Sequence, residues 1–135
     1  MSEINHRDSV VRYWWTKAEE SLASAQREVE ARSFSFAMNR IYYAAFYAVS
    51  AALLNRHIAF KKHSGVRAAF HREFIKSDLL DAQWGKFYNQ LYEDRQEGDY
   101  VALSNFEHEY VFTQLVRCRE FLSQLHPLVV PPNRT

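Results

Sequence analysis

Apolar residues recur every three or four positions through most of the chain, which is the period of a helix that buries one face. The first such stretch runs from about Asp8 to Ala31, and polar residues occupy its opposite side. The pattern predicts a long amphipathic helix at the start of the chain. The residues of its apolar face are Val11, Trp15, Ala18, Leu22, Ala25 and Val29.

The segment from Arg40 to Leu54 is apolar on nearly every side and reads RIYYAAFYAVSAALL. A helix of this length rises roughly 22 Å, whereas a membrane span needs roughly 20 apolar residues. A helix that is apolar all round must be covered all round, and its five alanines let neighbouring helices approach closely. With Ser33 or Ser35 as its N-cap and an end near Asn55, this helix is expected at the centre of a bundle.

Three tyrosines of this central segment, Tyr42, Tyr43 and Tyr47, each combine a large apolar ring with a polar hydroxyl. Such side chains suit a partly solvated interface better than a dry core. We therefore expect a subunit contact or a ligand groove on their side of the helix.

Two shorter helices are predicted next. Ser64 is expected to cap the first, and Ser77 or Asp78 is expected to cap the second. Gly98 is expected to stop the second helix near residue 97. The apolar face of the first of these helices is formed by Val66, Ala69, Phe70 and Phe74.

A last helix is indicated by Ser104, which with Glu107 three residues later fits a capping box. Pro127 is expected to end it, and the three prolines between residues 127 and 135 predict an extended tail. The sequence therefore predicts an all-α protein. Residues 1–126 would form a single-domain bundle of about five helices, and residues 127–135 a proline-rich C-terminal tail.

Charge and cysteine content narrow the class of protein. The formal net charge is +1, so the chain as a whole is not expected to attract nucleic acid strongly, and any RNA contact would be local. The single cysteine, Cys118, has no internal disulfide partner, and the first residues lack the apolar core of a signal peptide. We therefore expect a cytoplasmic protein without a membrane segment, in which Cys118 is a small packing residue.

The first candidate for chemistry is Arg40 at the start of the central helix, with Tyr43 and Tyr47 on the same face. A guanidinium among phenol rings can bind a phosphate or stack on a base. The structural alternative is an ion pair between Arg40 and an acidic residue of the first or fourth helix.

The second candidate is the basic segment KKHSGV, in which Lys61 and His63 lie just before a predicted helix start that favours anions. Arg67 and His71 follow His63 at steps of four residues, so one face of that helix is basic. The alternative is a solvated surface. No carboxylate or thiol at suitable spacing completes a metal site, and neither a metal nor a cofactor is predicted.

The third candidate is the segment RQEGDY, in which Arg95 and Asp99 lie four residues apart and Gly98 is expected to turn Tyr100 towards a cleft. An arginine there can hold a phosphodiester while a polar neighbour orients or transfers a proton. The structural alternative is a helix terminator with an Arg95–Asp99 ion pair.

These segments, NRIYYAAFYAVSAALL, KKHSGVRAAFHREFI and LYEDRQEGDY, resemble the HEPN domain family, in particular its small stand-alone prokaryotic members. The resemblance covers roughly residues 10 to 125. It implies a bundle of about five helices that dimerises around the helices carrying the active motif. Many HEPN proteins are metal-independent endoribonucleases, and several are toxins paired with a nucleotidyltransferase-type antitoxin. Others bind nucleotides or proteins without catalysis.

The family's catalytic motif is an arginine followed, after four to six residues, by a histidine. Arg95 matches the arginine, but the residue at the expected place is Tyr100, and the next histidine, His108, is thirteen residues beyond Arg95. A tyrosine with a pKa near 10 donates a proton or hydrogen bond but is a poor base at neutral pH. His63 could reach the cleft from another helix or from a second subunit.

Three hypotheses follow from the sequence. The leading one is a HEPN component of a toxin–antitoxin or related defence pair, with catalytic candidates Arg95, Asp99 and Tyr100. Its candidates for substrate binding are Arg40, Tyr43, Lys61 and His63. The second is a non-catalytic helical module that binds another copy or a nucleotidyltransferase partner. The third is a regulator that binds a nucleotide.

Overall fold

The computed structural model describes the backbone of residues 2–100 and 106–130, and side chains within residues 6–95 and 106–130. The described part contains helices only, which confirms the predicted all-α class. Their bounds are α1 (Ser2–Glu30), α2 (Phe34–Leu54), α3 (His63–Phe70), the five-residue π-helix η1 (His71–Ile75), α4 (Ala82–Tyr100) and α5 (His108–Val129).

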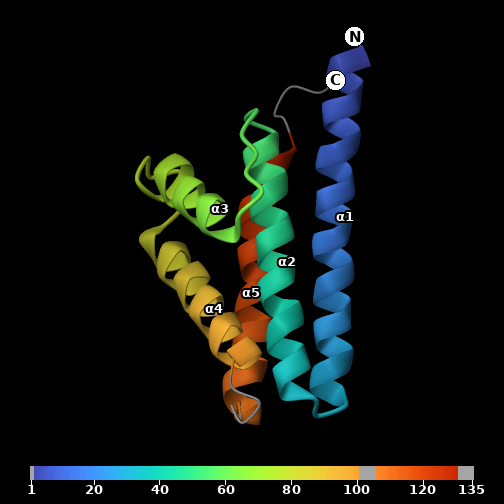
Figure 1. Ribbon diagram of the computed structural model, residues 1–135, viewed down its shortest axis with the longest axis vertical. Helices are drawn as coiled ribbons and strands as arrows, with labels where there is room; N and C mark the ends of the chain where they lie inside the picture. Colours follow the sequence, from blue (N-terminus) through green and yellow to red (C-terminus); the bar gives the residue numbers. More distant parts are fainter. Residues whose placement is uncertain (1, 101–105, 131–135) are drawn as a thin grey trace.

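Helix α2 lies in the middle of the bundle, as its all-round apolar character predicts. It contacts α1, α3, α4 and α5. Helices α1, α2 and α5 run roughly alongside one another, while α3 and α4 lie on the side away from α1 (Figure 1). No helix in the described ranges is long and apolar enough to cross a membrane.

Close packing around α2 depends on its alanines. All five lie fully buried, as do Ala18 and Ala25 of α1. Small side chains on both helices let the two backbones approach, so α1 lies against α2 along much of its length (Figure 1). The five alanines of α2 are Ala44, Ala45, Ala48, Ala51 and Ala52.

Aromatic side chains fill the core between α3, η1, α4 and α5. Phe121 of α5 packs on Phe70 and on Trp84 and Phe87 of α4, with ring centroids 5.5 to 5.7 Å apart. Cys118, also on α5, is fully buried, and burial raises the pKa of its thiol to about 12. Cys118 is therefore a packing residue, as predicted, rather than a thiolate nucleophile.

Several helix boundaries differ from those predicted. Helix α1 begins at Ser2, and the N-cap of α3 is Lys62, so Ser64 lies inside that helix. Helix α4 begins after Asp81, whose carboxylate accepts a hydrogen bond from the Gln83 backbone N–H at 2.9 Å. Asp78 instead adopts a left-handed conformation with φ 62°. The prediction that Ser77 or Asp78 caps α4 is therefore wrong.

Neither of the expected helix breakers ends its helix. Gly98 lies within α4, where a glycine costs only about 1 kcal/mol relative to alanine. Pro127 lies within the last turn of α5, where its missing N–H removes a single hydrogen bond and the Val130 N–H still bonds to the carbonyl of His126. Ser104 of the proposed capping box lies outside the described residues, and Glu107 makes no side-chain cap. The C-terminal tail beyond residue 130 also lies outside them.

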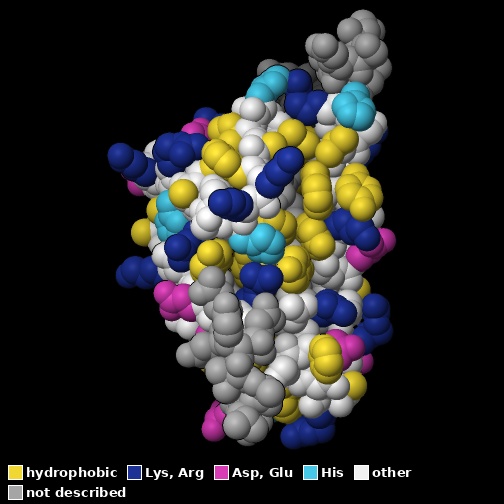
Figure 2. Space-filling view, in the orientation of Figure 1, with side chains coloured by type: hydrophobic (Ala, Val, Ile, Leu, Met, Phe, Trp, Pro, Cys, Tyr) yellow, Lys and Arg dark blue, Asp and Glu magenta, His cyan; other side chains and the backbone are white. Residues whose placement is uncertain are grey.

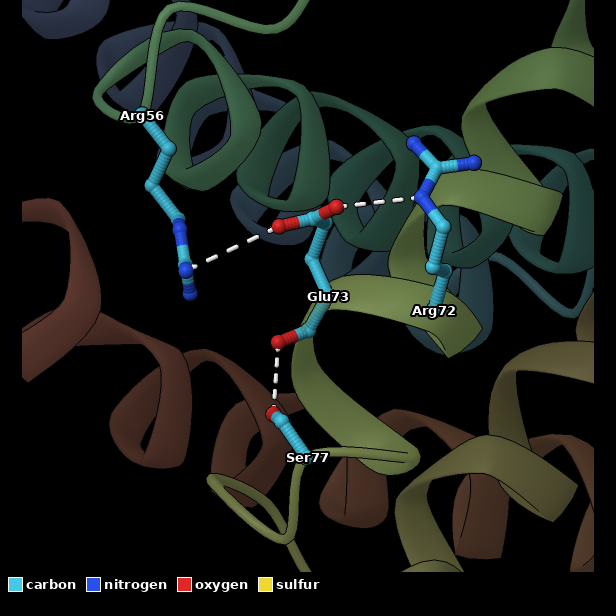
Figure 3. Close-up of polar contacts among 4 residues, drawn as sticks. All are labelled: Arg56, Arg72, Glu73 and Ser77. Atoms are coloured by element: carbon cyan, nitrogen blue, oxygen red, sulfur yellow. Dashed lines mark hydrogen bonds and ion pairs between the residues drawn. The ribbon is translucent and has the colours of Figure 1, made fainter.

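The π-helix η1 joins α3 to the turn before α4. Its wider spacing is shown by the Lys76 N–H, which bonds to the carbonyl of His71 at 2.8 Å. Figure 3 shows that the Glu73 carboxylate reaches Arg56, just after α2, at 3.6 Å, and that Ser77 donates to the Glu73 carbonyl at 2.6 Å. The carboxylate also pairs with the neighbouring Arg72. These contacts tie η1 to the end of α2.

Helix α4 approaches η1 closely at Gly85. The His71 Nε2–H donates to Oδ1 of Asn89 at 3.0 Å, which holds the imidazole across α4. A Cβ atom on Gly85 would lie 2.9 Å from Cε1 of His71 and 3.3 Å from a side-chain carbon of Ile75. Glycine is therefore required at this position by the approach of the two elements.

We predict that Gly85→Ala destabilises the fold, although the same change in an exposed helix stabilises it by about 1 kcal/mol. The added methyl group clashes with a hydrogen-bonded His71, and such overpacking costs about 1–3 kcal/mol. Urea unfolding measures the change. Lys86→Ala, on the exposed side of α4, is the control and is expected to stay within about 0.5 kcal/mol. A stabilised Gly85→Ala protein would contradict the close approach.

A second prediction concerns α2. Ala48→Leu places a large side chain where no space remains, so the free energy of unfolding is expected to fall by about 1–3 kcal/mol. Ala68→Leu, on the exposed face of α3, is expected to change it by less than about 0.5 kcal/mol. Equal unfolding midpoints for the two variants would show that α2 is not packed as described.

Candidate functional site

Aromatic rings of α2 and the imidazole of a histidine of α3 pack together on one side of α2. We define the aromatic cluster as Tyr42, Tyr43 and Phe46 of α2 with His63 of α3. The His63 ring stacks on Phe46 with centroids 4.3 Å apart and planes 11° apart. It also lies nearly parallel to Tyr42, 5.7 Å away, and edge-on to Tyr43. His63 is thus fixed against α2 by rings on several sides.

Arg95 of α4 reaches the same cluster. Its guanidinium carbon lies 5.3 Å from the ring centroid of Tyr42 and 5.5 Å from that of Tyr43. Its Nη2 donates a hydrogen bond to the Tyr43 hydroxyl at 3.2 Å. Cation–π contacts and this bond hold the planar guanidinium in place while it keeps its charge.

Tyr42 connects the histidine to the arginine. Its hydroxyl and Nδ1 of His63 lie 2.8 Å apart and share a hydrogen bond, while Arg95 lies over its ring. Tyr42 is fully buried, and this burial raises its pKa far above the ordinary value, so the hydroxyl stays protonated. The expectation that all three tyrosines would lie at a partly solvated face is therefore wrong for Tyr42. It holds for Tyr43 and Tyr47, which are partly exposed.

The His63 imidazole is predominantly neutral at pH 7. Partial burial lowers its pKa below the ordinary 6.5, and the nearby Arg95 guanidinium lowers it further. Because Tyr42 bonds to Nδ1, the other ring nitrogen, Nε2, is not engaged by this contact. A neutral imidazole can accept a proton from a hydroxyl group that becomes a nucleophile.

The structure brings some of the predicted site residues together and separates others. Arg95, Tyr43 and His63 meet in the aromatic cluster. Arg40 is exposed and lines a pocket shared with Arg95. Its guanidinium bonds to the side chain of Asn39 at 2.7 Å, so the predicted ion pair with α1 or α4 is not seen among the described residues. Lys61 is exposed close to the cluster, where it lines a pocket together with His63.

Two predicted catalytic residues are not placed. Asp99 and Tyr100 belong to α4, but their side chains lie outside the described residues. Their suggested roles beside Arg95 remain predictions. The expected turn at Gly98 is not formed, because α4 continues through it.

The basic stripe on α3 is not the solvated surface that was offered as its structural alternative. The Arg67 guanidinium carbon lies 4.1 Å from the ring centroid of Tyr92, and His71 bonds to Asn89, so both face α4. Periodicity placed the two residues on one face. It could not identify that face as the contact with α4, because both partners lie at least 18 residues away in the sequence.

Asp94 precedes Arg95 and was missed by the sequence reasoning. Its side chain is buried, and its carboxylate accepts hydrogen bonds from Tyr110 of α5 and, at 2.9 Å, from Gln90. The bond from Tyr110 links α4 to α5 at the residue before Arg95, and the bond from Gln90 lies within α4. The i, i+4 spacing of Gln90 and Asp94 was the available signal.

The pocket beside the cluster is lined mainly by apolar side chains and by Lys61. On the face drawn in Figure 2, hydrophobic side chains interleave with lysine, arginine and histidine over the centre, and Asp and Glu lie nearer the edges. Within the part of the chain that the structure describes, no group of three or more His, Cys, Asp or Glu side chains is arranged to hold a metal ion.

The protein is an all-helical bundle in which an arginine and a histidine from different helices contact the same buried tyrosine. Residues 11–126 match the model of the HEPN domain, so the chain belongs to the HEPN domain family. A UPF0332 protein of Thermotoga maritima is 41% identical over 126 residues, which cover 93% of this chain and 96% of that protein.

Two similar proteins of Methanocaldococcus jannaschii are each named "Putative toxin". One is 37% identical over 117 residues, covering 87% of this chain and 80% of its own. The other is 32% identical over 92 residues, covering 68% of this chain and 69% of its own.

The geometry predicts the titration of His63. By NMR, its midpoint should lie below 6.5, and Arg95→Gln should raise the midpoint without restoring it fully, because burial is the larger cause. The His63→Gln spectrum assigns the signal among the six histidines. A midpoint unchanged by Arg95→Gln would contradict the proximity of the two groups.

The same lowered pKa makes stability depend on pH. The unfolded chain, with an ordinary value near 6.5, takes up the proton first as pH falls, so folding is weakened below about pH 6.5. Well above that pH neither the folded nor the unfolded chain binds this proton, so the destabilisation is absent. His63→Gln is expected to show a smaller loss of stability between pH 7.5 and pH 5 than the unchanged protein.

Proposed function

We propose that this protein is the toxin of a toxin–antitoxin or related defence pair and that it cleaves RNA without a metal ion. The observation that carries the proposal is the meeting of Arg95 and His63 over Tyr42 and Tyr43. Membership of the HEPN family and the names of the two Methanocaldococcus relatives support it.

His63 supplies a histidine although none follows Arg95 at the spacing of the family motif. It comes from α3 rather than from α4, and its ring is oriented by the hydrogen bond to Tyr42 and by stacking on Phe46. A neutral imidazole is the form that a general base needs, and the lowered pKa of His63 keeps it neutral. The tautomer with the proton on Nδ1 leaves the Nε2 lone pair for this task.

The proposed reaction begins with a ribose 2′-hydroxyl that lies next to the scissile phosphate. His63 takes its proton, the 2′-oxygen forms a bond to phosphorus, and the bond from phosphorus to the 5′-oxygen breaks. Water returns a proton to that leaving oxygen. The Arg95 guanidinium stabilises the negative charge that grows on the phosphoryl oxygens. The products are a 2′,3′-cyclic phosphate and a 5′-hydroxyl end.

The proposal includes two assemblies. The protein is expected to form a homodimer, and its antitoxin is expected to be a small nucleotidyltransferase-type protein, as the family resemblance implies. Exposed apolar side chains on α2 and α5 are suitable for such contacts. They are Phe36, Phe112 and Val116.

Arg95→Ala is expected to lower kcat/KM for RNA cleavage at least about a hundredfold, because a preorganised charge on the transition state is lost. His63→Gln should lower it comparably. Product ends are identified by mass spectrometry, and growth arrest on expression gives a second readout. Arg12→Ala, exposed on α1, is the matched control and should change neither. Unchanged cleavage by folded Arg95→Ala protein would contradict the assignment of the site.

A second candidate function is a non-catalytic module that binds a nucleotidyltransferase partner. The tyrosine at position 100, where the family motif has histidine, favours it. In that case purified protein cleaves no RNA in a broad set of substrates, while it forms a complex with such a partner whose affinity is insensitive to Arg95→Ala and His63→Gln.

A further inference from the structure

A pocket of about 450 Å³ lies next to the aromatic cluster, between α1, α2 and the segment that leads into α3. Its walls include two stacked ring pairs. Trp14 stacks on Tyr47 at 5.4 Å, and Phe46 stacks on His63 at 4.3 Å. Phe46 and Tyr47 are themselves inclined at 61°, so the two pairs form walls that face in different directions.

Phe60 lies at the rim of this pocket, and the glycine at position 65 makes room for its ring. Phe60 lines the pocket although its side chain is 47% exposed, and its ring lies directly against Gly65 of α3. A Cβ atom on Gly65 would lie 3.0 to 3.1 Å from three carbons of Phe60. The absence of a side chain at position 65 therefore lets Phe60 fold over the start of α3 and narrow the opening.

Among the residues that the structure describes, the pocket is lined by a lysine and by no acidic residue. The chain has 16 acidic residues, yet none of the described residues that line this pocket is acidic. Lys61 is exposed among the lining residues, and Tyr43 lines the pocket with one part of its side chain while its hydroxyl accepts a hydrogen bond from Arg95. An apolar, aromatic hollow is thus adjacent to two cations.

We propose that this pocket binds a nucleobase of single-stranded RNA, with the attached phosphate between Lys61 and Arg95. Flat rings next to cations match the two halves of a nucleotide, because a base stacks on aromatic faces and a phosphate needs positive charge. The choice of RNA rests on the proposed function. We choose a base rather than a protein side chain because Tyr43, which lines the pocket, is hydrogen-bonded to Arg95.

Substitution of Tyr47 tests base binding separately from RNA cleavage. Tyr47 stacks on Trp14, lines the pocket and is partly exposed. Tyr47→Leu removes the stacking face but keeps an apolar side chain, so helix α2 retains its packing. Tyr47→Phe keeps the face and removes only the hydroxyl.

The test uses a fluorescent 2′-O-methyl RNA oligonucleotide, which cannot be cleaved because its 2′-oxygen is blocked. Anisotropy titration should show affinity about five- to tenfold weaker for Tyr47→Leu and near normal for Tyr47→Phe. An oligonucleotide of equal charge with abasic positions should bind weakly to the unchanged protein. Tyr13→Leu is the matched control, since Tyr13 is 55% exposed beside Trp14 but does not line the pocket.

The outcomes separate this proposal from the proposed function. Absence of cleavage by every variant, together with the predicted loss of affinity in Tyr47→Leu, supports the base pocket and overturns the ribonuclease. Cleavage that depends on Arg95, with affinity unchanged in Tyr47→Leu, overturns the pocket alone. The pocket is also overturned if the oligonucleotide does not bind. If Tyr47→Leu turns a dimer into a monomer and leaves RNA affinity intact, the occupant is a second copy and the proposal is wrong.

Discussion

Helix α2 is buried along much of its length and packs against α1, α3, α4 and α5, so their positions follow from its side chains. Its alanines bring α1 against it, and its opposite side carries the rings that receive α3 and α4. A larger side chain at a fully buried position such as Ala48 would push a neighbouring helix away. It would also disturb the angle at which Tyr43 and Tyr47 are presented, because a helix moves as a rigid unit. The packing of one side of α2 therefore fixes the geometry of the site on the other.

Tyr42 connects the packing of α2 to the candidate site. A fully buried phenol that bonds to an imidazole and lies beneath a guanidinium has few alternative positions. Its raised pKa keeps the proton on the hydroxyl, so the group orients His63 and does not add a negative charge that would attract Arg95. The Arg95 guanidinium keeps its charge. The His63 imidazole is largely neutral at pH 7, because its pKa is lowered.

Much of this fold could be predicted from the sequence because helical periodicity reports directly which face is buried. Val11, Ala18, Ala25 and Val29 were placed correctly, and so was the central position of α2. Gly98 and Pro127 were misread because one glycine, or one missing hydrogen bond in the last turn, is not enough to end these helices. Local signals of this kind indicate where a helix can end, whereas packing decides whether it does.

The candidate site was harder to predict because its members come from separate helices. Arg95 was singled out at the end of α4 and also matches the arginine of the family motif. His63 lies 32 positions earlier, so the sequence could only suggest that it reaches the cleft from another helix or from a second subunit. The location of these two residues on different helices also affects the geometry of the site. With the arginine on α4 and the histidine on α3, their separation depends on how these helices pack, hence on the close approach of Gly85 to His71 and on the contact of Arg67 with Tyr92. A motif contained in one helix is held by that helix alone. A pair divided between two helices responds to any change in their packing, so substitutions far from both residues can alter the site.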